Sequence, residues 1–304
     1  MPTSCDGQCW ENPFGKASCW VYTDGGRIVC HQARLPVPVC IDGRRARGVL
    51  TVDVATHADY RRHGLFSSLL KAANEAECEQ GLEVGISFRG EGSMLPQWSR
   101  QQLAPLTHFI FPLDVSWLAE RLRLPRVLAR ALVRRPKARD PIEARSTSAP
   151  DVTALWEALA PSMRWGVVRD EGWWTWRFDG HPHRPYRQFV LRDNGRLSAA
   201  AVVRMARRDD HVFGDVLELM AASPQAARRL ICGIAAEVPG SVALTFLTQR
   251  ESDEGRLVRS IGFRPTPRRL ESNPLVLNLR DMCEAGLDLR PDVWRTTWAD
   301  MDHL

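Results

Sequence analysis

The chain has 304 residues, of which 44% are apolar and 25% are charged, and its formal net charge is +5. These proportions describe an ordinary globular protein of about two domains. No run approaches roughly 18 consecutive apolar residues, which excludes a transmembrane helix, and the polar N-terminus does not resemble a signal peptide. We therefore expect a cytoplasmic protein whose mildly basic charge suits an anionic cofactor as easily as nucleic acid.

The chain contains eight cysteines, five of them before residue 41. A zinc site would favour paired C-x-x-C motifs, and this region has none. We expect small, reduced cysteines in core or surface positions and no bound metal.

The first predicted elements are strands. Residues 17–22 and 27–39 read as an antiparallel pair, because Asp24-Gly25-Gly26 between them is a hairpin turn signal. A second turn, Asp42-Gly43, leads into residues 49–56, which are β-branched and apolar without Gly or Pro. Apolar side chains then recur at helical spacing from Leu65 onward, and Gly81 is a natural helix end.

A short loop with Gly64 joins that strand to that helix, which favours anion binding. The first N–H groups of a helix have no intrahelical partner, and the macrodipole adds about half a positive charge there. A phosphate docks on such a helix start, and the missing Cβ of Gly64 lets the backbone approach a pyrophosphate closely. Arg61 and Arg62 add positive charge. By itself this feature fits ordinary strand–helix packing equally well.

The complete string carries a more specific signal. Arg61-Arg62-His63-Gly64-Leu65-Phe66 resembles the [RQ]-x-x-G-x-[GA] pyrophosphate loop of the GNAT superfamily of acyl-CoA N-acyltransferases, and residues 54–60 resemble that family's fourth strand and its exit. Phe66 departs from the Gly or Ala of the pattern. A branch of the family has Phe followed by Ser, as Phe66-Ser67 does here, so we interpret the loop as a variant.

The resemblance implies acyl transfer from acetyl-CoA to an amine. The pantetheine arm of the cofactor would pair like a strand with residues 54–56, whose backbone N–H groups could hold the thioester carbonyl and the oxyanion. The expected cofactor-binding residues are Val54, Ala55, Thr56, Arg61, Arg62, His63, Gly64, Leu65, Phe66 and Ser67.

The amine must also lose a proton, so a base is expected nearby. Asp53 is the first candidate, because a carboxylate inside an apolar strand needs a reason, although a hydrogen-bonded structural Asp fits equally well. Glu91 is the second candidate, against the simpler interpretation of a solvated loop acid. The family often uses a Tyr to protonate the leaving thiolate; no Tyr of this chain stands in that place, and Ser93 is the nearest hydroxyl.

Further along the chain, residues 82–88 are predicted to form a buried strand, residues 95–103 a helix and residues 108–115 another strand. Residues 136–150 read as a linker. This order matches the core of the family from its second strand onward.

Residues 116–139 are predicted to be helical and are very basic. Arg126 and Arg130 share a face at i+4 spacing, against apolar residues that include Val127 and Leu128. We interpret them as an amphipathic helix packed between the domains with a solvated Arg face. An acidic partner or a membrane surface is the alternative.

The second half of the chain repeats the first at an offset of 169 residues, with no gap across one strand–turn–strand. Asp24 then aligns with Asp193, and Gly26 with Gly195. Later elements recur in order up to a strand at 275–279. Ala221-Ala222-Ser223-Pro224, a capped helix start, replaces the Gly-rich loop in this copy, so we expect no cofactor there.

We therefore predict an α+β fold, an αβα sandwich of two tandem GNAT-like domains, each a mixed, mostly antiparallel sheet flanked by helices. Residues 1–140 would form the acetyl-CoA-binding domain, which lacks the first strand and helix of the family, and residues 141–304 a degenerate copy.

The predicted function is N-acetyl transfer to a primary amine of a small polar acceptor, without nucleic-acid or membrane partners and with a homodimer as an open question. The alternative is a catalytically silent tandem protein that binds acyl-CoA or acts as a scaffold. A transferase that uses aminoacyl-tRNA is a third class, but that class does not need the loop at residues 61–66.

Overall fold

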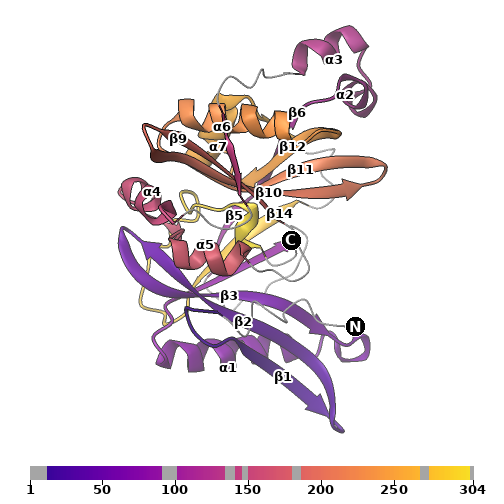
Figure 1. Ribbon diagram of the computed structural model, residues 1–304. Coiled ribbons are helices and arrows are strands. Elements are labelled where there is room, and N and C mark those ends of the chain that lie inside the picture. The colour runs from indigo at the N-terminus through magenta and orange to yellow at the C-terminus, as the bar shows by residue number, and fades with distance from the viewer. Residues whose placement is uncertain are drawn as a thin grey trace. The chain divides into compact units, whose positions relative to one another are not determined.

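The computed structural model describes residues 12–90, 101–133, 141–145, 150–179, 186–267 and 274–301. These residues form two mixed sheets flanked by helices (Figure 1), which confirms the predicted α+β class. The chain divides into two compact units that contain one sheet each. Unit 1 comprises residues 1–105, 163–168 and 273–294, and unit 2 comprises residues 106–162, 169–272 and 295–304.

The sheet of unit 1 is built on long antiparallel strands. Its strands, in spatial order, are β1 (Ser18–Asp24), β2 (Arg27–Ile41), β3 (Arg44–Thr56), β4 (Val84–Gly90), β14 (Leu275–Asp281) and β5 (Gln101–Pro105), with β8 (Gly166–Val167) also paired to β2. β3 and β4 are parallel and are joined by a 3₁₀ turn η1 (Ala58–Tyr60) and helix α1 (Leu65–Glu79). Helix α1 lies along one face of β1 and β2 (Figure 1).

The sheet of unit 2 has the same plan. Its strands, in spatial order, are β13 (Arg264–Pro265), β6 (Thr107–Pro112), β12 (Ser241–Thr248), β11 (His211–Ala221), β10 (Arg196–Arg208), β9 (Arg187–Asp193) and β7 (Glu143–Arg145). Its helices are α2 (Val115–Leu122), α3 (Arg126–Leu132), α4 (Val152–Leu159), α5 (Glu171–Phe178), α6 (Pro224–Glu237) and α7 (Asp253–Ile261), followed by a 3₁₀ turn η3 (Trp298–Asp300). Helices α6 and α7 bury aliphatic and phenylalanine side chains against this sheet.

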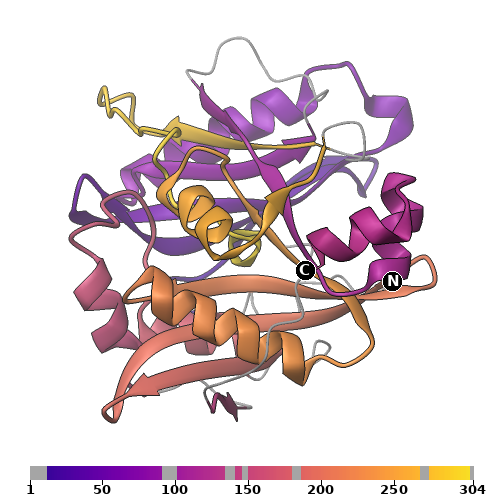
Figure 2. The same cartoon turned by 90° about the horizontal axis from the view of Figure 1, so that it is seen from above.

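Each sheet receives one strand from the other half of the chain. β14 lies between β4 and β5 in the first sheet, where the yellow strand runs among purple ones (Figure 2). Conversely, β6 follows β5 in the chain but pairs with β12 and β13 in the second sheet. The strand predicted at residues 108–115 therefore does not complete the first sheet. The two compact units cut across the predicted division at residue 140 because of this exchange.

Two predicted helices differ from the structure. Residues 101–105, at the end of the predicted helix 95–103, are strand β5, and the rest of that helix lies outside the described residues. The predicted continuous helix over residues 116–139 is two short helices, α2 and α3, that are separated at Pro125. Proline lacks an N–H, and Pro125 takes the N-cap position of α3 instead of continuing α2.

One pair of cysteines corrects the expectation of reduced thiols. Cys78 near the end of α1 and Cys283, just after β14, form a disulfide across 205 residues of sequence. The bridge fastens the exchanged strand to the helix that packs on the same unit. Cys19, Cys30 and Cys40 are among the described cysteines with free thiols.

Candidate active site

Strands β3 and β4 diverge in the middle of the first sheet. Their parallel register runs from Gly48 opposite Val84 to Leu50 opposite Ile86 and ends there. β3 continues to Thr56 paired only to β2, and β4 continues to Gly90 paired only to β14. Because each strand has a partner on its outer side alone, backbone groups on the inner sides are available to a strand-like ligand.

Asp53 stands at a bulge in β3, not in regular strand as the sequence predicted. Its φ is 47°, and the register between β2 and β3 shifts between His31 and Ala33, opposite this position. Asp is one of the few side chains that tolerate a left-handed conformation. The bulge re-aims the following residues, and Val54 and Ala55 are exposed along the diverging part of β3.

The start of α1 is an open anion-binding end. Gly64 is its N-cap, at φ 77°, with no side-chain capping hydrogen bond and no acidic residue in the first turn. The N–H of Ser68 donates to the Gly64 carbonyl at 3.0 Å, so the N–H groups of Leu65, Phe66 and Ser67 precede the first helical bond. A Cβ on Gly64 would meet no atom within 4 Å, which leaves open space over the helix start.

Side-chain contacts tie this loop to the end of β3. Arg61 Nε donates to the carbonyl of Thr56 at 3.2 Å, and Arg62 has a left-handed φ of 66°. His57 caps η1, and its Nε2 lies 2.9 Å from an Arg27 nitrogen. The structure therefore brings together the two predicted cofactor segments, residues 54–56 and residues 61–67.

A buried polar cluster sets the position of α1 on the sheet. The guanidinium of Arg34 in β2 donates to Glu77 of α1 at 2.6 Å and to Asn74 at 2.7 Å. Arg34 also donates to the Thr51 hydroxyl at 2.8 Å, which connects the helix to β3 at the point of divergence. Removal of one partner from such a buried charged pair strongly destabilises a fold. The pair therefore holds α1 in one position on the sheet.

The sequence did not single out Ser87 and Asn278, which meet at the same point. Ser87 is the first residue of β4 beyond the last pair with β3, and Asn278 is its register partner on the exchanged strand β14. Asn278 Nδ2 donates to Ser87 Oγ at 2.9 Å, and Asn278 Oδ1 is buried without a hydrogen-bond partner in the described structure. A single Asn inside the apolar segment 275–279 was the only sequence signal.

Glu91 and Ser93 lie outside the described residues, as does the loop that carries them. Among the described residues, no group of three or more His, Cys, Asp or Glu side chains is arranged to hold a metal ion. No described helix is long and apolar enough to cross a membrane.

The corresponding helix start in unit 2 is closed. Ser223 caps α6 through a hydrogen bond from the Ala226 N–H, and Pro224 occupies the first turn. The capping interaction predicted from the sequence is therefore confirmed. A capped start with no left-handed glycine offers fewer free N–H groups to an anion than the start of α1 does.

Protein side chains also fill the region where β11 leaves β12. The parallel register of that pair ends at Asp215, and the C-terminal η3 contacts both strands. Glu218 of β11 is fully buried and accepts from Arg169 at 2.7 Å, from Thr297 at 3.0 Å and from Arg295. Burial alone would raise the pKa of Glu218, but the two arginines outweigh it and hold that pKa at about 2.

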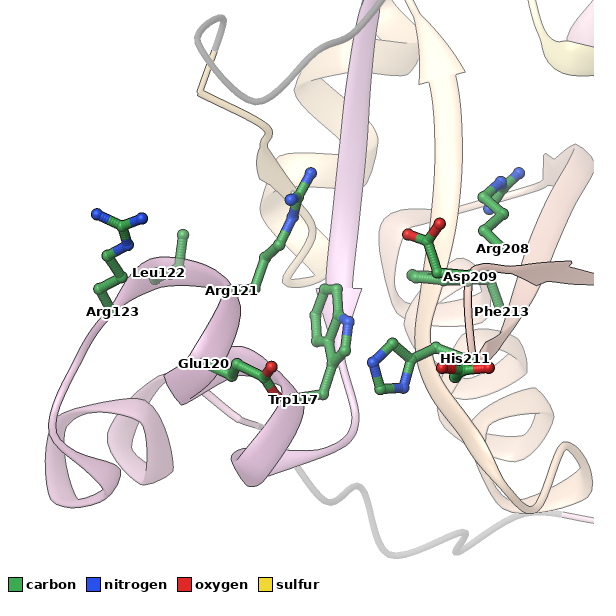
Figure 3. A pocket seen from close by; sticks show the side chains of 10 residues that line it. Trp117, Glu120, Arg121, Leu122, Arg123, Arg208, Asp209, His211 and Phe213 are labelled. Carbon is green, nitrogen blue, oxygen red and sulfur yellow. The ribbon is translucent and has the colours of Figure 1, made fainter.

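Unit 2 also contains a separate pocket of about 960 Å³ between α2 and the turn that joins β10 to β11. Trp117 and His211 face one another in it (Figure 3). Three arginines and three carboxylates line the pocket, so their formal charges balance. The pocket lies in unit 2 and does not belong to the site in unit 1.

Residues 3–89 match the family described as acetyltransferase (GNAT) domain. The matched segment ends at β4 and contains the divergence of β3, the loop and α1. Among functionally curated proteins, no sequence matches the chain significantly.

Solved structures with the same fold cover most of the chain at low identity. A GCN5-related N-acetyltransferase from Anabaena variabilis aligns with a TM-score of 0.61 and 15% identity over 86% of this chain; the alignment spans only 62% of that protein. A probable N-acyltransferase from Enterococcus faecalis aligns with a TM-score of 0.63 and 13% identity, and the alignment covers 96% of this chain and 67% of that protein. Saccharomyces cerevisiae N-myristoyltransferase with bound myristoyl-CoA aligns with a TM-score of 0.60 and 14% identity, and the alignment covers 86% of this chain and 70% of that protein.

Proposed function

We propose, from the match of residues 3–89 to the acetyltransferase (GNAT) domain family, that the protein transfers an acetyl group from acetyl-CoA to a primary amine of a small polar acceptor. The observation that carries the proposal is the combination, in unit 1, of diverging strands with an uncapped helix start. The strand register ends at Leu50, and Gly64 opens α1 at φ 77°.

The two parts of the site fit the two parts of an acyl-CoA. The free N–H groups at residues 65–67 suit the pyrophosphate, with Arg61 and Arg62 beside them. The diverging part of β3 offers backbone groups that can pair with the pantetheine amides and hold the thioester carbonyl. One structural neighbour has myristoyl-CoA bound, so a longer acyl chain should be tested beside acetyl.

Asp53 is the proposed base, with Glu91 as the second candidate and Ser93 as a donor to the leaving group. The bulge supports the role of Asp53, because it interrupts the regular strand at this residue, just beyond the last β3–β4 pair at Leu50. In this proposal Asp53 accepts the amine proton, directly or through water, while β3 backbone N–H groups hold the carbonyl oxygen.

We propose one cofactor site per chain. Residues 1–140 and 141–304 would be tandem copies that have exchanged their last strands, and only the first would keep the loop. The capped start of α6 and the filled region around Glu218 support this assignment. A cytoplasmic location and a homodimer remain proposals from the sequence.

Calorimetric titration with acetyl-CoA tests the site directly. We expect one site per chain, and we expect Gly64→Asp to abolish binding, because a strained side chain with a negative charge enters the proposed phosphate site. Gly195→Asp is the matched control: Gly195 has a φ of 78° and equal free space but lies in unit 2. Two sites per chain, or unchanged affinity in Gly64→Asp, would contradict the proposal.

Release of free thiol from acetyl-CoA in the presence of an amine panel tests catalysis. Asp53→Asn should lower turnover by about 10²–10⁴-fold, the usual contribution of a general base, with nearly unchanged acetyl-CoA affinity. Binding without thiol release for every amine would favour the catalytically silent alternative. Myristoyl-CoA in the same assay compares the acyl chains.

A further inference from the structure

The outer face of α3 is apolar and exposed, contrary to the packing predicted from the sequence. The side chain of Val127 is 80% exposed and that of Leu128 is 54% exposed, and Ala129 is the buried residue of this helix. At 100° per residue, Val127 lies opposite Ala129, and Arg130 lies beside it. The exposed face therefore joins aliphatic side chains to a guanidinium.

This face belongs to a firmly packed pair of helices. Trp117, Leu118 and Ala119 of α2 form one buried cluster with Ala129 of α3 and with Phe213 of β11. The Trp117 and Phe213 rings are edge-to-face at 5.6 Å between centroids. Asp114 caps α2, and Arg126 donates to Ser116 across the two helices at 2.7 Å. The core of unit 2 holds the inner side, so the exposed side is presented as a fixed surface.

The charge of this helix pair is positive. Residues 115–132, from the start of α2 to the end of α3, contain four arginines and one carboxylate, that of Glu120, whereas the whole chain has a net charge of only +5. The pair therefore carries a net charge of +3, and all other residues together carry +2. The arginines are Arg121, Arg123, Arg126 and Arg130, and all four are exposed.

We propose that the α2–α3 pair docks this protein on an anionic lipid bilayer surface. Exposed aliphatic side chains flanked by arginines on one helical face are the chemistry of an interfacial helix, which inserts apolar groups between lipids and pairs its cations with anionic headgroups. Trp117, the aromatic side chain of the pair, is buried, so base stacking on a nucleic acid has no exposed contributor there. A bilayer would bury the exposed aliphatic side chain of Val127, whereas contacts with the phosphates of a nucleic acid would leave it exposed to water.

Sedimentation of the full-length protein with lipid vesicles tests the proposal. The protein should pellet with vesicles of phosphatidylcholine mixed with phosphatidylglycerol, should stay in solution with phosphatidylcholine alone, and should be released by added salt. Arg130→Gln should weaken partitioning about fivefold, whereas Arg228→Gln, which removes another exposed charge, on α6, should leave it nearly unchanged.

The apolar contribution has its own matched pair. Leu128→Ser should weaken partitioning about five- to tenfold, and Ile28→Ser, a side chain 55% exposed in unit 1, should have little effect. Absence of binding to the anionic vesicles, or equal losses in the test and control variants, overturns the proposal. Arg130-dependent binding to duplex DNA or to polyglutamate without vesicle binding overturns it in favour of another anionic partner.

Discussion

At the scale of single residues, the most informative side chains are Ser87 and Asn278. Ser87 lies where β3 and β4 part, and Asn278 donates to its hydroxyl oxygen at 2.9 Å. The Ser87 hydroxyl proton is then directed away from Asn278. If acyl-CoA lies between the diverging strands, we predict that this hydroxyl, in place of that of Ser93, donates to the leaving sulfur, a role for which the chain has no Tyr in the family's usual place.

Ser87→Ala should therefore lower turnover by about tenfold with little change in acetyl-CoA affinity. Asn278→Ala should have a smaller effect in the same direction, because it frees the Ser87 hydroxyl to rotate. Ser260→Ala removes an exposed hydroxyl that donates to a backbone carbonyl on α7 and should leave turnover unchanged. Full activity of Ser87→Ala in the thiol-release assay would rule out this donor.

At the scale of elements, the Cys78–Cys283 disulfide joins α1 to the end of β14. Thiol titration of the denatured protein should find two fewer thiols without reductant than the eight found with it. Cys283→Ser should lower the free energy of unfolding by about 2–4 kcal/mol relative to Cys19→Ser, which removes an exposed free cysteine. Equal stability of the two variants under oxidising conditions would contradict a stabilising bridge.

The same bridge bears on the proposed cytoplasmic location. Glutathione and thioredoxin keep such pairs reduced in most cytosols. Trapping of thiols at the moment of cell lysis should find Cys78 and Cys283 reduced if the protein works there. Recovery of the oxidised pair would indicate an oxidising compartment.

Acid should destabilise unit 2 through Glu218. Its folded pKa of about 2 lies below the ordinary value of 4.5, because two buried arginines stabilise the carboxylate. The folded state thus binds fewer protons, so the stabilisation is complete above about pH 4.5 and is lost as the pH falls toward 2. The expected loss is on the order of 3 kcal/mol.

Chemical denaturation between neutral and acid pH measures this effect. Burial raises the pKa of Glu254, so that residue changes stability in the opposite sense and partly offsets the loss. Glu218→Gln should be less stable at neutral pH, because Arg169 and Arg295 lose their carboxylate, and should lose the dependence on acid. If the free energy of unfolding of this variant falls with pH as steeply as that of the parent protein, groups other than Glu218 cause the acid sensitivity.

At the scale of the whole molecule, the exchange of β6 and β14 makes each unit depend on both ends of the chain. Residues 1–140 expressed alone would lack β14, which leaves facing edges of β4 and β5 unpaired, and would carry β6 without its partners. We expect this fragment to aggregate or to bind a hydrophobic dye. A monodisperse, cooperatively folding fragment would contradict the expectation. The full chain with an inserted protease site at residues 134–140 is the control, and its two pieces should remain associated after cleavage.

The sequence by itself determined the local chemistry. The loop at residues 61–67, the helix that follows Gly64, the cap at Ser223 and the long hairpins all depend on neighbours in the chain, and helix starts, turns and alternating patterns are local properties. The α+β class and the resemblance to acyltransferases followed from them.

Only the tertiary structure decided which strand lies beside which. Strand pairing is a long-range choice: nothing in residues 84–90 says that their partner is 191 residues further along the chain, as it is for Ser87 and Asn278. The exposure of Val127 and the burial of Glu218 were equally undetermined, because both depend on what packs against an element and not on its own pattern. The sequence also did not determine the bulge at Asp53 or the side chains that surround Glu218 in unit 2, since each is set by contacts with distant segments.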